Sequence, residues 1–291
     1  MHKRGLKYFV VDVFANEQFY GNPLAVIEIP KELALTEYKD IAKEFGYSET
    51  SFVHYSKSTN TLRVRSFTPT GFEINGAGHN LLGAVHAVLK NDIYFKLSPA
   101  EIPKIIMKDK TIPIGIDRYK VGILQQPASL LKKIPSEKIS EAISISKEDI
   151  YNIMEPTVVK TEVAHLMVPL TNSEVLNRAN PKKALLQELA EQYGFQGVYC
   201  FALSENNSDF ISKTRFFNPG IGIVEDPATG SAAGPLIGFL SHHHLVQRNK
   251  TYKIIQGEKM GRPSILSVCI EPDGILLSGT AIISMEGTIF I

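Results

Sequence analysis

The alternation of apolar and polar positions divides the first half of the chain into strands and helices. It predicts strands at 8–14 and 24–29, then a helix at 33–45. A strand hairpin follows at 51–55 and 61–67, and a second helix begins after Gly78. Gly46 follows the first helix, where a glycine in the left-handed conformation commonly ends a helix. Apolar residues from Leu81 to Leu89 recur at helical spacing, so the second helix is expected to bury one face.

The second half repeats this order of elements. The pattern predicts a strand at 163–170 and a helix at 181–193. Two strands follow at 197–203 and 209–216, and a final helix begins after Ser231. Asn180 and Pro181 are typical of the N-cap and first position of a helix, and Gly194 is placed to end it. Pro235 is expected about where the first turn of the last helix ends, where its missing N–H costs less.

Two segments with similar motifs reinforce this repeat. Each begins with an arginine (residues 65 and 215) and continues through a proline and a glycine-rich loop into a helix. The prolines Pro69 and Pro219 are 150 residues apart, and the glycines Gly78 and Gly230 are 152 apart. The chain is therefore predicted to be an α+β protein of two pseudo-symmetric lobes, each a mixed, mainly antiparallel sheet wrapped around a central helix. The expected lobes are 1–118, joined by a C-terminal strand at about 276–291, and 119–275.

Composition narrows the class of protein. Of 291 residues, 44% are hydrophobic and 21% charged, as in ordinary globular proteins. A net charge of +1 without clustered Lys and Arg argues against nucleic-acid binding. No apolar run approaches the length of a membrane span, about 18 residues, and the first residues do not resemble a secretion signal. Cys200 and Cys269 lie in apolar segments without metal-site spacing, so we expect buried free thiols and a cytoplasmic enzyme.

The glycine-rich loops are the candidate functional segments. Each is expected to leave backbone N–H groups unpaired at a helix start, where anions bind. In Asp226-Pro-Ala-Thr-Gly-Ser231, glycine permits close backbone approach, and Thr229 or Ser231 can cap the helix or bind a carboxylate. An ordinary capped helix start is the alternative. Neither loop has the pattern of a P-loop or of a dinucleotide-binding fingerprint.

Three further features carry titratable groups. His79, beside the first helix start, is either a structural hydrogen-bond donor or a catalyst, and Ser231 is its counterpart in the second half. The run His242-His-His244 is interpreted as a solvated helix end, because consecutive helical residues do not share a face. Glu49 precedes an apolar strand, where partial burial would raise its pKa and suit it to proton transfer; the alternative is a surface glutamate.

Taken together, the motifs resemble the phenazine-biosynthesis isomerase-like (PhzF-like) family, which has the fold of diaminopimelate epimerase. The matching pieces follow the family's order along nearly the whole chain: Asp12-Val-Phe14, Gly21-Asn-Pro23, Ser48-Glu-Thr50, Glu73 with Gly78-His79, Glu225-Asp-Pro-Ala-Thr-Gly-Ser231, and Gln256-Gly257 with Gly261-Arg-Pro-Ser264. The Asp-Pro-Ala-Thr-Gly-Ser segment is the most specific of them.

The resemblance implies an active site in a cleft between two lobes, without cofactor or metal. By position it implies that Glu49 is the general acid/base and that three residues position the substrate and assist proton movement: His79, Asp226 and Ser231. It also implies that a small carboxylate-bearing substrate is bound by Gly78, Gly230, Thr229 and, from a neighbouring loop, Asn22. A homodimer is implied, with no nucleic-acid or membrane partner.

Related racemases use two cysteines on these loops, whereas this chain has Ala77 before Gly78 and no cysteine in 225–231. A proton shift by the single carboxylate of Glu49 is the chemistry that is left. Asn80 stands where the family more often has proline or alanine, which bears on substrate identity. The alternative function is a non-catalytic protein that binds a small carboxylate in the same cleft.

Overall fold

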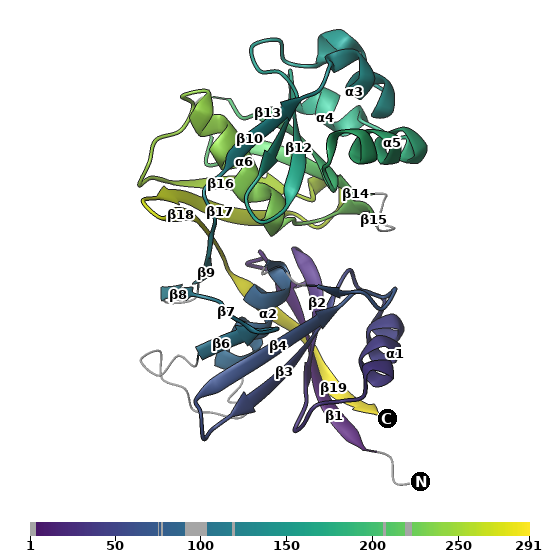
Figure 1. Cartoon of the computed structure of the whole chain (residues 1–291), viewed down its shortest axis with the longest axis vertical. Helices are drawn as coiled ribbons and strands as arrows, with labels where there is room; N and C mark the ends of the chain where they lie inside the picture. Colours follow the sequence, from purple (N-terminus) through teal and green to yellow (C-terminus); the bar gives the residue numbers. More distant parts are fainter. Residues whose placement is uncertain are drawn as a thin grey trace. The chain divides into compact units, whose positions relative to one another are not determined.

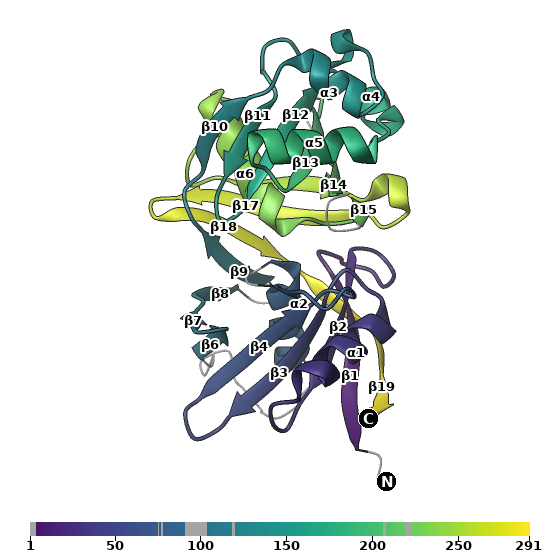
Figure 2. The same cartoon turned by 45° about the vertical axis from the view of Figure 1, so that its right-hand side comes forward.

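The computed structural model describes residues 4–74, 76, 78–90, 104–117, 120–205, 208–218 and 223–291. The chain forms two compact units, Met1–Ile123 with Gly279–Ile291, and Leu124–Ser278. The C-terminal strand thus returns to the first unit. Each unit is a sheet with helices on its faces (Figures 1 and 2).

The elements of the first unit are β1 (Gly5–Val13), β2 (Asn22–Glu28), α1 (Leu35–Phe45), β3 (Thr50–Ser56), β4 (Thr61–Phe67), β5 (Glu73–Ile74), α2 (His79–Lys90), β6 (Lys104–Met107), β7 (Lys110–Thr111), β8 (Ile114–Asp117), the start of β9 (Lys120–Gln125) and β19 (Ala281–Phe290). The sheet has the order β19-β1-β2-β3-β4-β6-β7, and β5 pairs with β4. The pairs β2–β3 and β4–β6 are parallel and the others are antiparallel, so the sheet is mixed.

The two faces of this sheet carry different helices (Figure 2). On one face, α1 buries Tyr38 against the side chains of β2, β3 and β4. On the other face, α2 packs against β1 to β4 and β19 and buries Leu81, Leu82, Val85 and Val88. A Cβ atom at Gly83 would lie 2.6 Å from both Leu24 and Val13, so the absent side chain lets α2 approach the sheet closely.

The elements of the second unit are the end of β9, β10 (Ser129–Lys133), α3 (Ser136–Ala142), η1 (Lys147–Asp149), β11 (Thr157–Lys160), β12 (Ala164–Leu170), α4 (Ser173–Arg178), α5 (Lys183–Tyr193), β13 (Gly197–Leu203), β14 (Ser212–Asn218), β15 (Ile223–Asp226), α6 (Gly230–His242), β16 (Thr251–Gln256), η3 (Glu258–Met260), β17 (Ser264–Glu271) and β18 (Gly274–Gly279). The strand order is β10-β11-β12-β13-β14-β16-β17-β18, and β15 pairs with β14.

This second sheet is also mixed, since β12–β13 and β14–β16 are parallel and the other pairs antiparallel. Helix α6 packs on β10, β11, β12 and β17, with Ala232, Leu236, Ile237 and Leu240 fully buried. Helices α3, α4 and α5 cover a separate apolar cluster that includes Leu186 and Val198. The expected fold class, two lobes each built around a central helix, is therefore confirmed.

Most predicted elements are present, and Gly46 and Gly194 end α1 and α5 in the left-handed conformation as expected. The expected start of α5 is wrong. Its N-cap is Lys182 rather than Asn180, because the backbone N–H groups of residues 180 and 182 donate to carbonyls at the end of α3. Tertiary hydrogen bonds thus override the local capping signal.

Three smaller expectations also need correction. Strand β14 begins at Ser212 instead of residue 209. Pro235 is the sixth residue of α6, beyond the first turn, so the carbonyl of Ser231 lacks its helical N–H partner. Cys200 is buried, but Cys269 is only partly buried; both are free thiols. The predicted turn at 205–208 lies partly outside the described residues.

Candidate functional site

Glu49 and His79 meet in the first unit. Glu49 lies in the short loop between α1 and β3, and His79 is the first residue of α2. Atom Nδ1 of His79 is 3.7 Å from Oε2 of Glu49, and the two side chains are only 10% and 18% exposed. Burial lowers the pKa of His79 to about 4, so its imidazole is neutral at pH 7. A carboxylate therefore lies beside a neutral imidazole in a mostly water-excluded place.

Asn22 is tied to the loop that carries Glu49. It is buried at the start of β2, and the hydroxyl of Ser48 donates to its Oδ1 at 3.3 Å. This hydrogen bond joins the turn at Gly21 to the residue preceding Glu49. The sequence-predicted residues Asn22, Glu49 and His79 are thus brought into one region of the first unit.

Gly78 is the N-cap of α2, because its carbonyl accepts the N–H of Leu82. Its own N–H already has an acceptor, since it donates to Oδ1 of Asn80 at 2.8 Å. The Nδ2 of Asn80 donates in turn to the carbonyl of Gly76 at 3.1 Å. A substrate carboxylate at the N–H of Gly78 would require this buried asparagine to turn away.

The second helix start is organised by a glutamine on β16. Thr229 is the N-cap of α6, and its N–H donates to Oε1 of Gln256 at 3.1 Å. The Nε2 of Gln256 donates to the carbonyl of Asp226 at 2.7 Å and to Oγ1 of Thr229 at 3.0 Å. The Thr229 hydroxyl donates to the Asp226 carboxylate at 2.5 Å. Asp226 and Thr229 are consequently fixed in one buried network.

The two helix starts share one hydrogen-bond arrangement, which the sequence did not predict. In each unit a side-chain amide accepts the N–H of the N-cap residue and donates to a carbonyl two or three residues earlier. Asn80 does so from within α2, and Gln256 does so from a neighbouring strand. By position in the helix, Ser231 corresponds to Asn80 rather than to His79, because α6 begins at the glycine and α2 begins one residue after it. The N–H groups of Gly230 and Ser231 donate to no other residue in the described part of the chain.

Ser231 has a partner that sequence reasoning missed. Its hydroxyl lies 3.1 Å from Nε2 of His165, a residue of β12 that is 2% exposed. Burial lowers the pKa of His165 to about 3. The imidazole is therefore neutral. No motif marks His165, since it stands in an ordinary strand pattern far from residue 231 in the sequence.

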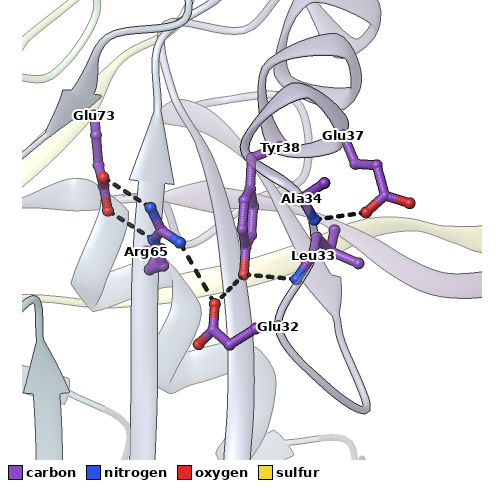
Figure 3. A network of polar contacts seen from close by, with 7 residues as sticks. All are labelled: Glu32, Leu33, Ala34, Glu37, Tyr38, Arg65 and Glu73. Carbon is purple, nitrogen blue, oxygen red and sulfur yellow. Dashed lines mark hydrogen bonds and ion pairs between the residues drawn. The ribbon is translucent and has the colours of Figure 1, made fainter.

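Each loop is also held by an arginine–glutamate pair. Arg65 makes two hydrogen bonds to Glu73, at 2.8 and 2.9 Å, and contacts Glu32 at 3.4 Å (Figure 3). Its guanidinium stacks on Tyr38, whose hydroxyl donates to Glu32. Hydrogen bonding to Arg65 lowers the pKa of Glu73. The carboxylates of Glu73 and Glu32 both accept hydrogen bonds from Arg65, so this arginine stabilises the fold of the first unit.

Arg215 repeats this arrangement in the second unit. It makes two hydrogen bonds of 2.8 Å to Glu225, and its remaining terminal nitrogen donates to the carbonyls of Leu176, Asn177 and Ala179. The 150-residue repeat in the sequence contained a signal for this pairing, because Arg65 and Arg215 begin the two segments. Both pairs stabilise the strand pair that leads into the central helix.

The described part of the chain has neither a group of metal-ligating side chains nor a membrane-spanning helix. Among the residues that the structure describes, no three His, Cys, Asp or Glu side chains are grouped so as to hold a metal ion. No described helix has the length and apolar character to cross a bilayer. The run His242–His244 lies at the end of α6 and does not form part of such a group.

Comparison with known proteins places these features in a family. The chain belongs to the phenazine biosynthesis-like protein family (PhzC-PhzF), whose model matches residues 11–287. An uncharacterized isomerase of Clostridium acetobutylicum is 32% identical, covering 96% of each chain. The trans-2,3-dihydro-3-hydroxyanthranilate isomerase of Pseudomonas aeruginosa is 28% identical, covering 95% of this chain and 94% of its own.

A solved structure agrees with this assignment at the level of the fold. A PhzF-family phenazine biosynthesis protein of Bacillus anthracis superposes with a TM-score of 0.87 at 23% identity, covering 99% of this chain and 100% of its own. The family resemblance inferred from the motifs is confirmed. This chain is an enzyme of the isomerase class.

Proposed function

We propose that this chain is a cofactor-independent isomerase that moves a proton between two carbons of a small carboxylate-bearing substrate, with Glu49 as the acid/base. The observation that carries the proposal is the pairing of Glu49 with a buried, neutral His79 at 3.7 Å. A neutral imidazole does not reduce the basicity of the neighbouring carboxylate, whereas an imidazolium would weaken it as a base. Partial exclusion of water strengthens each electrostatic interaction at this place.

A single side chain, that of Glu49, can both remove the proton and return it. The carboxylate of Glu49 takes a proton from one carbon of the substrate, and the electron pair spreads into the adjacent conjugated system. The protonated Glu49 then returns the proton to a different carbon. Nothing is oxidised or reduced overall, so the reaction needs no redox cofactor. We assign His79 the role of orienting Glu49 and the reacting end of the substrate.

We further propose that the second helix start binds a small carboxylate through four residues: Asp226, Thr229, Gly230 and Ser231. Their support is the preorganised network around Gln256 and the N–H groups at the start of α6. Such N–H groups bind a carboxylate well, and a well-placed donor contributes roughly 3–4 kcal/mol where charge develops. Asn22 is assigned a bordering role through Ser48, and Gly78 a role as N-cap beside His79.

Conversion in D₂O tests the proposed isomerase. The purified chain is incubated with trans-2,3-dihydro-3-hydroxyanthranilate and with a panel of small amino and hydroxy acids, and the products are followed by mass spectrometry and NMR. An isomerase yields a rearranged acid with deuterium at carbon. Saturable binding without product or deuterium would instead favour the non-catalytic binding of these acids and contradict the proposed proton shift.

We also propose a cytoplasmic homodimer. Strand β19 is at an edge of its sheet, is ten residues long and exposes Met285 and Phe290. Long exposed edges of this kind are commonly covered. The free thiols of Cys200 and Cys269 suit a reducing compartment. Light scattering coupled to size exclusion measures the mass, and a monomer at micromolar concentration would contradict the dimer.

A further inference from the structure

Asp226 lies at the end of a series of buried, hydrogen-bonded side chains that begins on β13 and β14. Tyr199 of β13 and Gln256 of β16 are fully buried, and Thr214 of β14 is 3% exposed. The hydroxyl oxygen of Tyr199 is 2.9 Å from Oε1 of Gln256, and that of Thr214 is 3.0 Å from the Tyr199 oxygen. Thr229 joins Gln256 to Asp226. Bulk water does not compete for these hydrogen bonds, because every member of the series is buried.

Two backbone groups fix the orientation of the Gln256 amide. The N–H of Thr229 can only donate, so the amide atom 3.1 Å from it is the oxygen Oε1. The carbonyl of Asp226 can only accept, so the amide atom 2.7 Å from it is the nitrogen Nε2. Turning the amide over would place two acceptors together and two donors together. Its oxygen therefore accepts and its nitrogen donates.

The remaining hydrogen bonds take their direction from this amide. Because Oε1 of Gln256 accepts, the phenolic O–H of Tyr199 is the donor at 2.9 Å. Nε2 donates to Oγ1 of Thr229 at 3.0 Å, which leaves the single hydroxyl proton of Thr229 for Oδ2 of Asp226, 2.5 Å away. The donors thus run one way, in a relay formed by Tyr199, Gln256, Thr229 and Asp226. Hydrogen bonds in such a sequence polarise and strengthen one another.

A proton on Oδ2 of Asp226 would break this relay. The carboxylic acid would donate to Oγ1 of Thr229, and the Thr229 proton would have to point elsewhere. Thr229 has no other acceptor for it among the residues that the structure describes. A buried hydroxyl proton without an acceptor is unfavourable, whereas hydrogen bonds donated to a carboxylate stabilise its charged form. The geometry therefore favours an ionised Asp226.

We propose that Tyr199 is a positioning residue for Asp226, and that through the relay it keeps this carboxylate ionised and a hydrogen-bond acceptor. Tyr199 itself keeps its proton, because burial raises the pKa of its hydroxyl well above the ordinary value. An ionised Asp226 has no proton to give, so its part at the start of α6 is to accept hydrogen bonds, and the proton shift is left to Glu49. The inference rests on the proposed function only for the place of Asp226 in the site.

NMR spectra of the ligand-free protein test the relay directly. The hydroxyl proton of Thr229 and the carboxyl ¹³C of Asp226 are observed at pH 7 in the wild type and in Tyr199→Phe. The variant should fold, since Oε1 keeps the N–H of Thr229 and the hydroxyl of Thr214 keeps the carbonyl of Ile255, 3.1 Å away. We expect an ionised Asp226 in the wild type, and a Thr229 proton that is far downfield there and moves upfield in the variant. A protonated Asp226 in the wild type, or an unmoved Thr229 proton, overturns the proposal.

A double-mutant cycle tests the consequence for turnover. Thr229→Val interrupts the relay between Gln256 and Asp226. With an acid that the wild type converts, we expect Tyr199→Phe to lower kcat/KM about tenfold, which corresponds to about 1.4 kcal/mol. In the Thr229→Val background the same change should lower it by less than about twofold, because the path to Asp226 is already broken. Equal factors in the two backgrounds would mean that Tyr199 acts on the fold alone, and would contradict the proposal.

Tyr252→Phe is the matched control for both measurements. It removes a hydroxyl from the strand that carries Gln256, where the oxygen accepts the N–H of Gln247 outside the relay. It should leave the Thr229 proton and kcat/KM unchanged. If the wild type converts no acid, the proposed isomerase fails, and the NMR spectra still decide the role of Tyr199.

Discussion

Arg65 and Arg215 occupy equivalent places in the two units, and each donates two parallel hydrogen bonds to a glutamate on the strand that follows. The two pairs differ in burial. The side chains of Arg65 and Glu73 are 29% and 23% exposed, whereas those of Arg215 and Glu225 are 9% and 15% exposed. The same motif therefore has unequal energetic weight in the two halves.

Removing Arg215 is expected to be the more damaging change. Arg215→Met leaves the Glu225 carboxylate and three backbone carbonyls without their donor, which costs about 3–5 kcal/mol of unfolding free energy. Arg65→Met should cost less, because water reaches Glu73. Urea unfolding of both variants measures the difference. Lys7→Met, which removes an exposed pair with Glu286, is the control and should change stability by less than about 1 kcal/mol. Equal losses for the two arginines would contradict the burial argument.

Gln256 is expected to hold the loop before α6. Gln256→Leu leaves the N–H of Thr229, the carbonyl of Asp226 and the hydroxyl of Tyr199 without their partner, at a cost of roughly 1–3 kcal/mol for each unsatisfied group. Asn80→Leu frees only two backbone groups and should be milder. Amide hydrogen exchange at Thr229 and Gly78 reports each site separately. Unchanged protection at Thr229 in Gln256→Leu would show that the glutamine does not hold this loop.

Gly257 provides a steric test of the same region. Its φ is +81°, and a Cβ atom would lie 2.3 Å from the carbonyl oxygen of Arg262 and 2.6 Å from that of Pro227. Gly257→Ala should therefore destabilise the unit and disturb the adjacent Gln256. Gly261 has a similar φ of +69° with open space around it, so Gly261→Ala should cost only about 1 kcal/mol. Thermal unfolding compares the two, and an equal loss would mean that the backbone conformation alone matters.

Glu28 predicts a pH dependence of stability. Burial raises its pKa to about 7, against the weaker opposing effect of Lys7. The folded chain keeps a proton that the unfolded chain releases near pH 4.5, so unfolding free energy falls as pH rises from about 4.5 to 7, by roughly 1–3 kcal/mol. Glu28→Gln lacks this contribution. Its stability relative to the wild type should therefore rise across that window, and parallel pH profiles for the two proteins would refute the assignment.

Much of the fold was predictable because it depends on local pattern. The apolar stripes of α2 and α6 and the glycines after α1 and α5 act through neighbouring residues, and they appear where the sequence placed them. The start of α5 was not predictable in this way. Asn180 has the right chemistry for an N-cap, but its backbone is bound to the end of α3, which is distant in the sequence.

Some residues of the candidate site were also predictable from the sequence, and others were not. Glu49 and His79 were expected by resemblance, and the structure brings them together within the first unit. The partners that orient the loops were not foreseen, because His165 and Gln256 come from strands 66 and 27 residues away from Ser231 and Thr229. Asn80 was noticed as a departure from the family, but its hydrogen bond to Gly78 depends on the conformation of the helix start.

The role of Glu49 is the central claim, and Glu49→Gln tests it most directly. The variant, the wild type and Glu44→Gln, which changes an exposed glutamate of α1, are incubated in D₂O with an acid that the wild type converts. Glu49→Gln keeps size and polarity, so we expect unchanged folding and ligand binding, and a rate at least about 10²-fold lower. Glu44→Gln should match the wild type. A Glu49→Gln enzyme that retains most of its turnover and deuterium incorporation would contradict the assignment of Glu49 as the proton carrier.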